Sequence, residues 1–174
     1  QGNYGVSIGY ASGGTSQGES AIGIGHNAGS NAQGANSVAI GNLAGQSQQL
    51  NDSVAIGVNA GNSDQGSYSI AVGNSAALEA QGDYSVAFGA NAASFTQGNY
   101  AVALGQLAGH TSQSDSSVSI GREAGSNTQA AESVAIGMRA GRTSQGASAV
   151  SIGNLAGYNT QNAYAIGIGT LAGL

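Results

Sequence analysis

The chain has 174 residues, of which 31 are glycine, none is proline or cysteine, and only 6% are charged, with a formal net charge of −5. The acidic balance argues against a nucleic-acid partner, which requires a basic surface, and the absence of cysteine excludes disulfides and thiolate metal sites. No apolar run approaches the roughly 20 residues of a membrane-spanning helix, so we expect no membrane insertion of this segment.

A strict 16-residue repeat runs along the whole chain. Numbered from its glutamine, which recurs from Gln1 to Gln161, each repeat has Val or Ile at position 6, a large apolar residue at position 8 and Gly at position 9. Small residues occupy positions 5 and 7, and Ala occupies position 12 in every repeat but the first. Low charge with abundant Gly, Ser and Asn also suits a disordered chain, but disorder does not require glycines in register.

The first half of each repeat predicts a β-strand. Positions 5 to 9 alternate small and large apolar residues, as in Ser133 to Gly137, which is a period of two. The glycine at position 9 predicts a turn, position 12 lies in a second short segment, and polar residues form a corner back to the next glutamine. We therefore predict an all-β parallel β-solenoid, or β-roll, of about eleven 16-residue coils stacked about 4.8 Å apart. Residues 1–174 form one such domain, which we interpret as a segment of a longer fibrous protein.

The two faces of the strand are expected to have different roles. Positions 6 and 8 are predicted to fill the interior of the coil, because they carry the large apolar residues. So small a core barely offsets the ordering of sixteen residues, and a single chain is expected to be marginally stable. The small residues at positions 5 and 7 would let another chain approach, so we expect a homo-oligomer with parallel axes, most plausibly a homotrimer. The predicted core residues are Val38, Ile40, Val54, Ile56, Val86, Phe88, Val134 and Ile136.

Stacking of the coils also predicts two columns of side chains. Tyr68, Tyr84 and Tyr100 share position 4 of three consecutive repeats and should stack. This row is a possible interaction strip for a sugar or a protein, although packing between chains is the favoured interpretation. Glutamine amides can form a hydrogen-bonded ladder along the rod, which we favour over a recognition surface. The structural ladder is expected to include Gln33, Gln49, Gln65, Gln81, Gln97, Gln113 and Gln129.

Signatures of catalysis are weak. His26 and His110 lie in distant repeats, and the carboxylates share no fixed position or paired spacing. The Asp-rich nonapeptide of calcium-binding β-rolls does not occur. We therefore predict no enzymatic activity, no cofactor and no intrinsic metal. Arg122, Arg139 and Arg142 form a small positive patch, for which a solvated corner is favoured over a contact with an anionic partner.

The pentad Ser-Val-Ala-Ile-Gly, followed by two variable residues and a small one, recurs closely in residues 37–44 and 133–140, and also in 85–92 and 117–124. This pattern resembles the head repeat of trimeric autotransporter adhesins, the YadA-like head, and the resemblance covers the whole chain. It implies a left-handed parallel β-roll, a homotrimer and an extracellular, cell-surface rod, anchored through parts outside this segment. Attachment to a host or matrix is implied as the function, with an extracellular matrix protein or a glycan as partner.

Other functions remain open at this point. Similar repeats occur in viral and phage fibres, so a fibre on a virion surface, or a self-assembling extracellular filament whose repeats serve chain–chain assembly, is the alternative. Ice binding by a flat solenoid face is a distant third. It would need rows of outward threonines, and the row that contains Thr96, Thr128 and Thr160 is broken by other residues.

Overall fold

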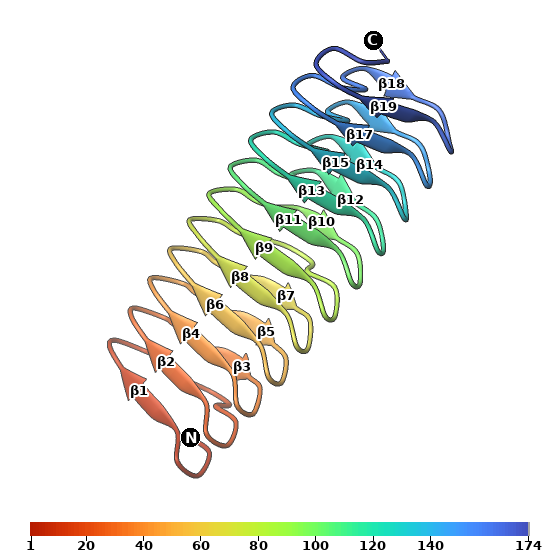
Figure 1. Cartoon of the computed structure of the whole chain (residues 1–174). Coiled ribbons are helices and arrows are strands. Elements are labelled where there is room, and N and C mark those ends of the chain that lie inside the picture. Colours follow the sequence, from red (N-terminus) through yellow and green to blue (C-terminus); the bar gives the residue numbers. More distant parts are fainter. Residues whose placement is uncertain (174) are drawn as a thin grey trace.

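The computed structural model describes residues 1–173 as a rod of stacked coils (Figure 1). One long side of the coils forms a parallel sheet of eleven strands that follow one another in sequence order. No helix occurs among residues 1–173, and hence none that could span a membrane. The strands of this sheet are β1 (Val6–Ile8), β2 (Ile22–Ile24), β4 (Val38–Ile40), β6 (Val54–Ile56), β8 (Ile70–Val72), β9 (Val86–Phe88), β11 (Val102–Leu104), β13 (Val118–Ile120), β15 (Val134–Ile136), β17 (Val150–Ile152) and β19 (Ile166–Ile168).

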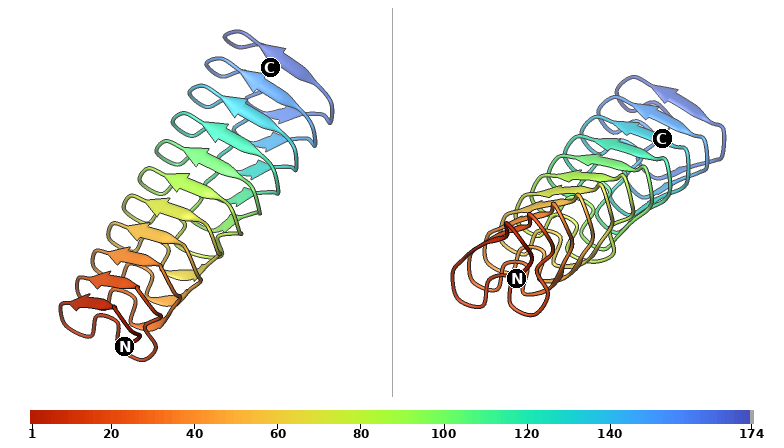
Figure 2. Two further views of the ribbon diagram at one scale, coloured as in Figure 1. Left: turned by 60° about the horizontal axis from the view of Figure 1, so that its bottom comes forward. Right: turned by 90° about the horizontal axis from the view of Figure 1, so that it is seen from below.

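The other side of the coils carries two smaller parallel sheets. The three-stranded sheet consists of β3 (Asn31–Gln33), β5 (Ser47–Gln49) and β7 (Ser63–Gln65). The five-stranded sheet consists of β10 (Thr96–Gln97), β12 (Ser112–Gln113), β14 (Thr128–Gln129), β16 (Ser144–Gln145) and β18 (Thr160–Gln161). Isolated bridges from Gln65 to Gln81 and from Gln81 to Gln97 continue the pairing between them. Seen obliquely from one end, the coil is a flattened loop with two sides and two corners (Figure 2).

The register of the sheets equals the sequence repeat. Val54 of β6 pairs with Val38 and with Ile70, its equivalents one repeat before and after. Every residue therefore lies beside its own equivalent in the neighbouring coils, about 4.8 Å away along the rod. The predicted parallel β-solenoid is confirmed.

The corners depend on unusual backbone conformations. Position 9 is glycine in all eleven coils, with φ between 119° and 134°. In coils 1 to 10, a Cβ there would lie 2.4–2.8 Å from carbonyl atoms of the equivalent glycine in the next coil, so only glycine fits. Positions 4 and 11 adopt left-handed φ values in every coil although no glycine occupies them, as at Tyr84 (55°) and Leu107 (58°). These corners keep the coil narrow.

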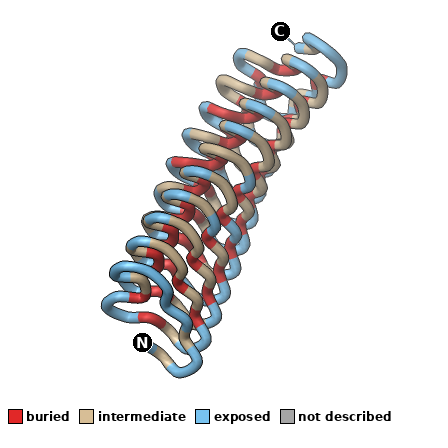
Figure 3. Tube along the Cα trace, turned by 90° about the vertical axis from the view of Figure 1, so that its left-hand side faces the viewer, coloured by how far each residue is buried: buried red, intermediate tan, exposed pale blue. Residues whose placement is uncertain are grey.

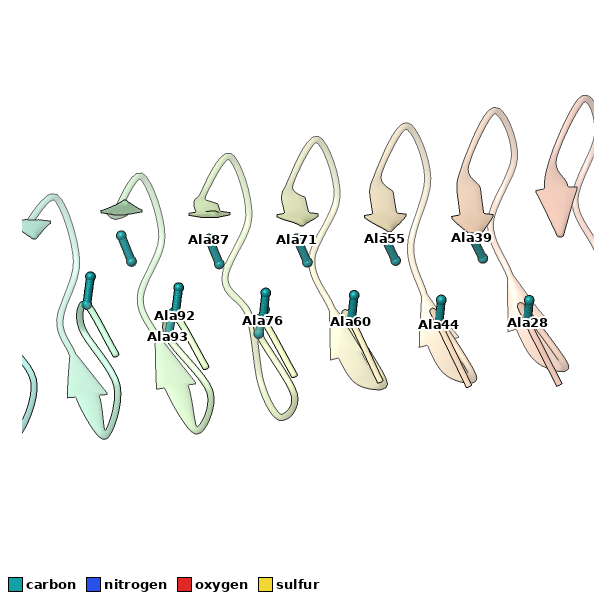
Figure 4. Packing of buried hydrophobic residues seen from close by; sticks show 13 residues of the cluster. Ala28, Ala39, Ala44, Ala55, Ala60, Ala71, Ala76, Ala87, Ala92 and Ala93 are labelled. Carbon is teal, nitrogen blue, oxygen red and sulfur yellow. The ribbon is translucent and has the colours of Figure 1, made fainter. Parts of the chain in front are cut away.

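The interior holds small side chains, and the predicted core is wrong. Ala39, Ala55 and Ala71 are fully buried and face alanines at position 12 across the interior, such as Ala60 (Figure 4). A tube coloured by burial marks the same inner positions as buried along the rod (Figure 3). None of the eight predicted core residues is buried; they are Val38, Ile40, Val54, Ile56, Val86, Phe88, Val134 and Ile136.

The narrow coil explains this inversion. A Cβ added at Gly45 would lie 3.2 Å from the Cβ of Ala39 and 2.5 Å from the Oε1 of Gln49, so the interior has no room for Val or Ile. Alternation along a strand identifies the residues that share a face, but it does not say which face points inward. The small face at positions 5 and 7 therefore packs inside its own coil, and the expected approach of another chain to that face is also wrong.

Candidate functional site

An apolar face runs along the rod, which we define as the outward side chains of positions 6 and 8 on the eleven-stranded sheet. All of them are Val, Ile, Leu or Phe, in two unbroken columns. Within the rod they are shielded mainly by their neighbours above and below, but Phe88 is 55% exposed and Ile168, in the last coil, is 66% exposed. Soluble monomers rarely expose an apolar surface of this extent, so the apolar face is a candidate binding surface.

The seven glutamines of the predicted ladder are all buried. Each side-chain amide crosses the interior and donates to the position 6 carbonyl of the preceding coil, as from Gln65 Nε2 to Val54 O at 2.8 Å. Amide-to-amide bonds link Gln81 to Gln97 and Gln97 to Gln113, both at 3.1 Å. Within residues 1–173, the Oε1 atoms of Gln49, Gln65 and Gln81 have no hydrogen-bond partner, so the chain of amides is interrupted there. The glutamines thus hold consecutive coils together and offer no surface for recognition.

Serine at position 7 supplies the partner that these amides lack. Ser7 Oγ donates to Gln17 Oε1 at 2.8 Å, and Ser151 Oγ donates to Gln161 Oε1 at 2.5 Å. Ser119 Oγ donates in the same way to Gln129 Oε1. In the coils that precede the unpartnered glutamines, position 7 is alanine, which has no hydroxyl to donate.

The tyrosine column consists of Tyr68, Tyr84 and Tyr100, at the corner where β8, β9 and β11 begin. The rings stack with centroids 4.9 and 5.3 Å apart and planes within 9° of parallel. Each side chain is at least half exposed. Because the rings cover one another, the accessible parts are their edges, their hydroxyls and the outer faces of the two end rings. A sugar therefore finds no row of open ring faces along this column.

All three basic residues of the chain gather at the opposite corner, around Glu123. Arg139 Nε and Arg142 Nε each lie 3.0 Å from Glu123 Oε2, while Arg122 Nε lies 4.0 Å from Oε1. The hydrogen bond from Arg139 lowers the pKa of Glu123; partial burial opposes this, and the charges of the arginines add to it. Arg122 has the most exposed side chain of the three, at 50%.

A shallow groove follows position 2 along the rod, where most coils have glycine. Three depressions of about 370, 210 and 380 Å³ lie along it. Asp64 and Asp83 line the second and Asp115 lines the third, and no lysine or arginine lines any of them. Within residues 1–173, no group of three His, Cys, Asp or Glu side chains is placed to hold a metal ion.

The outward direction of the apolar face is what sequence reasoning missed. A signal was present, because positions 5 and 7 never carry anything larger than serine or alanine. A strict upper limit on size is typical of a tight interior, since an outward small residue would vary more freely.

Comparison with known proteins agrees with this architecture. The family model of the YadA head domain repeat matches two stretches, residues 16–44 and 80–108. The same motif continues through the other coils in register, and the resemblance to a YadA-like head is confirmed. No curated protein and no solved structure matches the chain.

Proposed function

Starting from a chain that carries YadA head domain repeats, we propose that it forms a homotrimeric, extracellular adhesive rod that attaches a cell surface to a host or matrix. YadA-type heads are surface-exposed parts of adhesins and are associated with homotrimeric assembly. Such heads are typical of structural adhesins rather than enzymes. The observation that carries the proposal is the apolar face, which a single chain leaves open over its full length.

Three parallel copies cover this face by turning it toward a common axis. The two columns at positions 6 and 8 are continuous, because every coil pairs with its neighbours in register. Identical rods with continuous apolar faces can pack side by side, and the buried area then grows with each coil. Closed three-fold symmetry leaves no copy with an open apolar face.

The adhesive surface in this arrangement is the outer side of the coils. It bears positions 14 to 16 and the groove at position 2, which carry mainly hydroxyl, amide and carboxylate groups. A partner that itself repeats, such as a matrix protein or a glycan, can contact several coils at once. Many weak contacts then add up through their effective concentration, which suits attachment better than one tight site.

The mass in solution tests the assembly, and sedimentation equilibrium measures it. We expect a trimer. Ile136→Asp should give a monomer that keeps the β-sheet circular dichroism spectrum, because a charge on the apolar face opposes burial between copies but not the coil itself. Ser112→Asp, on the outer side, is the matched control and should remain trimeric. A wild-type monomer, or an unfolded Ile136→Asp chain, would contradict the proposal.

Binding to arrays of matrix proteins and glycans tests the adhesive role. We expect the trimer to bind at least one of them and the Ile136→Asp monomer to bind it far more weakly, because avidity is lost. Growth of long filaments without any added ligand, together with no binding to either array, would instead favour a self-assembling fibre.

A further inference from the structure

The two corners that flank the apolar face meet in a closed trimer, so the inference below rests on the proposed function. Position 4 precedes each strand of the eleven-stranded sheet, and positions 10 and 11 follow it. In a three-fold ring of parallel copies, the position 4 corner of one copy lies beside the position 10–11 corner of the next. Closure of the ring allows no shift along the axis, so each coil faces the same coil of its neighbour.

One gap interrupts the position 4 corner, and we call it the Ser116 notch. Tyr84 covers one face of the Tyr100 ring, with centroids 5.3 Å apart. The other face of the ring points toward the next coil. That coil has only the small Ser116 at position 4, and the coil after it has Glu132. Tyr100 is accordingly the most exposed member of the tyrosine column, at 62%. The notch is thus bounded by an open aromatic face and a carboxylate two coils away.

The carboxylates at this corner have no cation within their own chain. Among residues 1–173, every ion pair involves Glu123. Asp115 Oδ1 accepts from the backbone N–H of Asn99 at 2.9 Å, and Glu132 Oε2 accepts from Ser148 Oγ at 3.1 Å. In the described part of the chain, the other oxygen of each carboxylate has no hydrogen-bond donor. The notch therefore combines an exposed π face with negative charge, which is the environment that a guanidinium group favours.

Two of the arginines lie on the other corner, in the same coils as the Ser116 notch and Glu132. Arg122 occupies position 10 of coil 8, the coil that contains Asp115 and Ser116, and Arg139 occupies position 11 of coil 9, the coil that contains Glu132. Arg139 is hydrogen-bonded to Glu123 at 3.0 Å. Among residues 1–173, Arg122 makes one side-chain hydrogen bond, to the Met138 sulfur, its Nε lies 4.0 Å from Glu123 Oε1, and its side chain is half exposed. Arg122 is therefore the less tightly held cation of the two.

We propose that Arg122 of each copy enters the Ser116 notch of the next copy, where its guanidinium stacks on the open face of Tyr100 and pairs with Asp115 and Glu132. A ring of three such contacts closes the trimer at coils 8 and 9. The apolar face is nearly identical in every coil, so these three charge-assisted contacts add a localised, directional term to otherwise uniform packing.

A disulfide tests whether the two corners meet. The chain has no native cysteine, so the double variant Ser116→Cys/Arg122→Cys introduces the only two thiols. Within one chain they lie at opposite corners of the coil, two residues beyond either end of the extended β13, so their Cα atoms are farther apart than the about 7 Å that a disulfide allows. Oxidation should therefore give covalently closed trimers on denaturing gels. Each single-cysteine variant is the control and should give monomers and at most dimers.

Charge reversal tests the energetic part. Glu132→Arg should raise the concentration at which half of the chains are trimeric by at least about tenfold, because each ring gains three like-charge contacts. Adding Arg122→Glu to the same chain should restore most of the loss. Glu79→Arg, an exposed position 15 residue away from both corners, is the matched control and should have little effect.

The outcomes separate this inference from the proposed function. A trimer that forms no covalent ring and is insensitive to Glu132→Arg would overturn the Arg122 contact and leave the trimer intact. A monomeric wild-type chain would overturn both. A trimer that binds an arginine-containing peptide with a stoichiometry of three, and loses the peptide in Glu132→Arg, would show that the notch is open to an external partner and would also overturn the inference.

Discussion

Coils 2 to 5 and coils 6 to 10 share one repeat but turn differently at position 16. In the first region, Gln48 and Asp64 have φ values of 56° and 55°, and in the second region the residues at this position are extended. The second region carries hydroxyl side chains there, three of them threonine, and a β-branched residue strongly disfavours positive φ. The backbone conformation of position 16 thus distinguishes the coils of the three-stranded sheet from those of the five-stranded sheet. The extended residues are Thr96, Ser112, Thr128, Ser144 and Thr160.

The two regions also differ in their interiors. The unpartnered amide oxygens belong to Gln49, Gln65 and Gln81, and the first two of these lie in the first region. In the second region Gln129 bonds to Ser119 and Gln145, and its Oε1 is satisfied. A buried polar atom without a partner costs about 1–3 kcal/mol. A nearly uniform repeat can thus hold a well-bonded and a poorly bonded segment, which differ in whether the amide oxygen accepts from a neighbouring glutamine or from a serine hydroxyl.

Replacing a buried glutamine by methionine should lower the free energy of unfolding more in the second region than in the first. Gln129→Met leaves the Ser119 hydroxyl without its acceptor and the Val118 carbonyl without the Gln129 Nε2 donor, which lies 2.9 Å away. We therefore expect a loss of about 3 kcal/mol in the free energy of unfolding. Gln65→Met loses one bond but also removes the unpartnered Oε1, so we expect a loss of about 1 kcal/mol. Urea unfolding followed by circular dichroism measures both, and equal losses would contradict the comparison.

A substitution to threonine at position 16 should lower stability only in the first region. Gln48→Thr places a β-branched residue at a φ of 56°, and we expect a loss of about 1–2 kcal/mol or a local change of the corner. Ser144→Thr is the matched control in the extended segment and should change stability by less than about 0.5 kcal/mol. Hydrogen exchange at the backbone amides of coils 3 and 4 would locate the effect. Unchanged exchange in Gln48→Thr would show that the corner tolerates either residue.

A hydroxyl added at position 7 of the first region should supply the missing hydrogen bond and bring its interior closer to that of the second region. Ala55→Ser places an Oγ where Ser119 and Ser151 have theirs, so that it can donate to the unpartnered Gln65 Oε1, and we expect a gain of about 1 kcal/mol. Ala135→Ser is the control, because Gln145 Oε1 already accepts from Gln129 Nε2 at 3.3 Å. A smaller gain there, measured by thermal unfolding, supports the comparison. The reverse order of the two gains would contradict it.

The sequence predicted the period, the glycine turn, the stacking of coils and a strand at positions 5 to 9, of which the structure forms positions 6 to 8, because each depends on local pattern and repetition. It did not predict which face of the strand points inward. That direction depends on the width of the coil, which is set by left-handed residues such as Tyr84 and Leu107, whose side chains do not favour that conformation. The pairing of Arg122 with the Ser116 notch could not be seen either, since it needs the corners on which the residues lie.

The glycine column at position 9 has a consequence for how the length of such a rod can change. In coils 1 to 10, a Cβ there would approach the carbonyl of the next glycine to within 2.8 Å, so the column tolerates no other residue and no change of phase. Loss or duplication of one whole repeat joins equivalent residues and keeps the column intact, whereas any other insertion breaks it. Mutations that add or remove whole repeats can therefore change the length of the rod in steps of about 4.8 Å. Each added coil fits the coils on both sides of it.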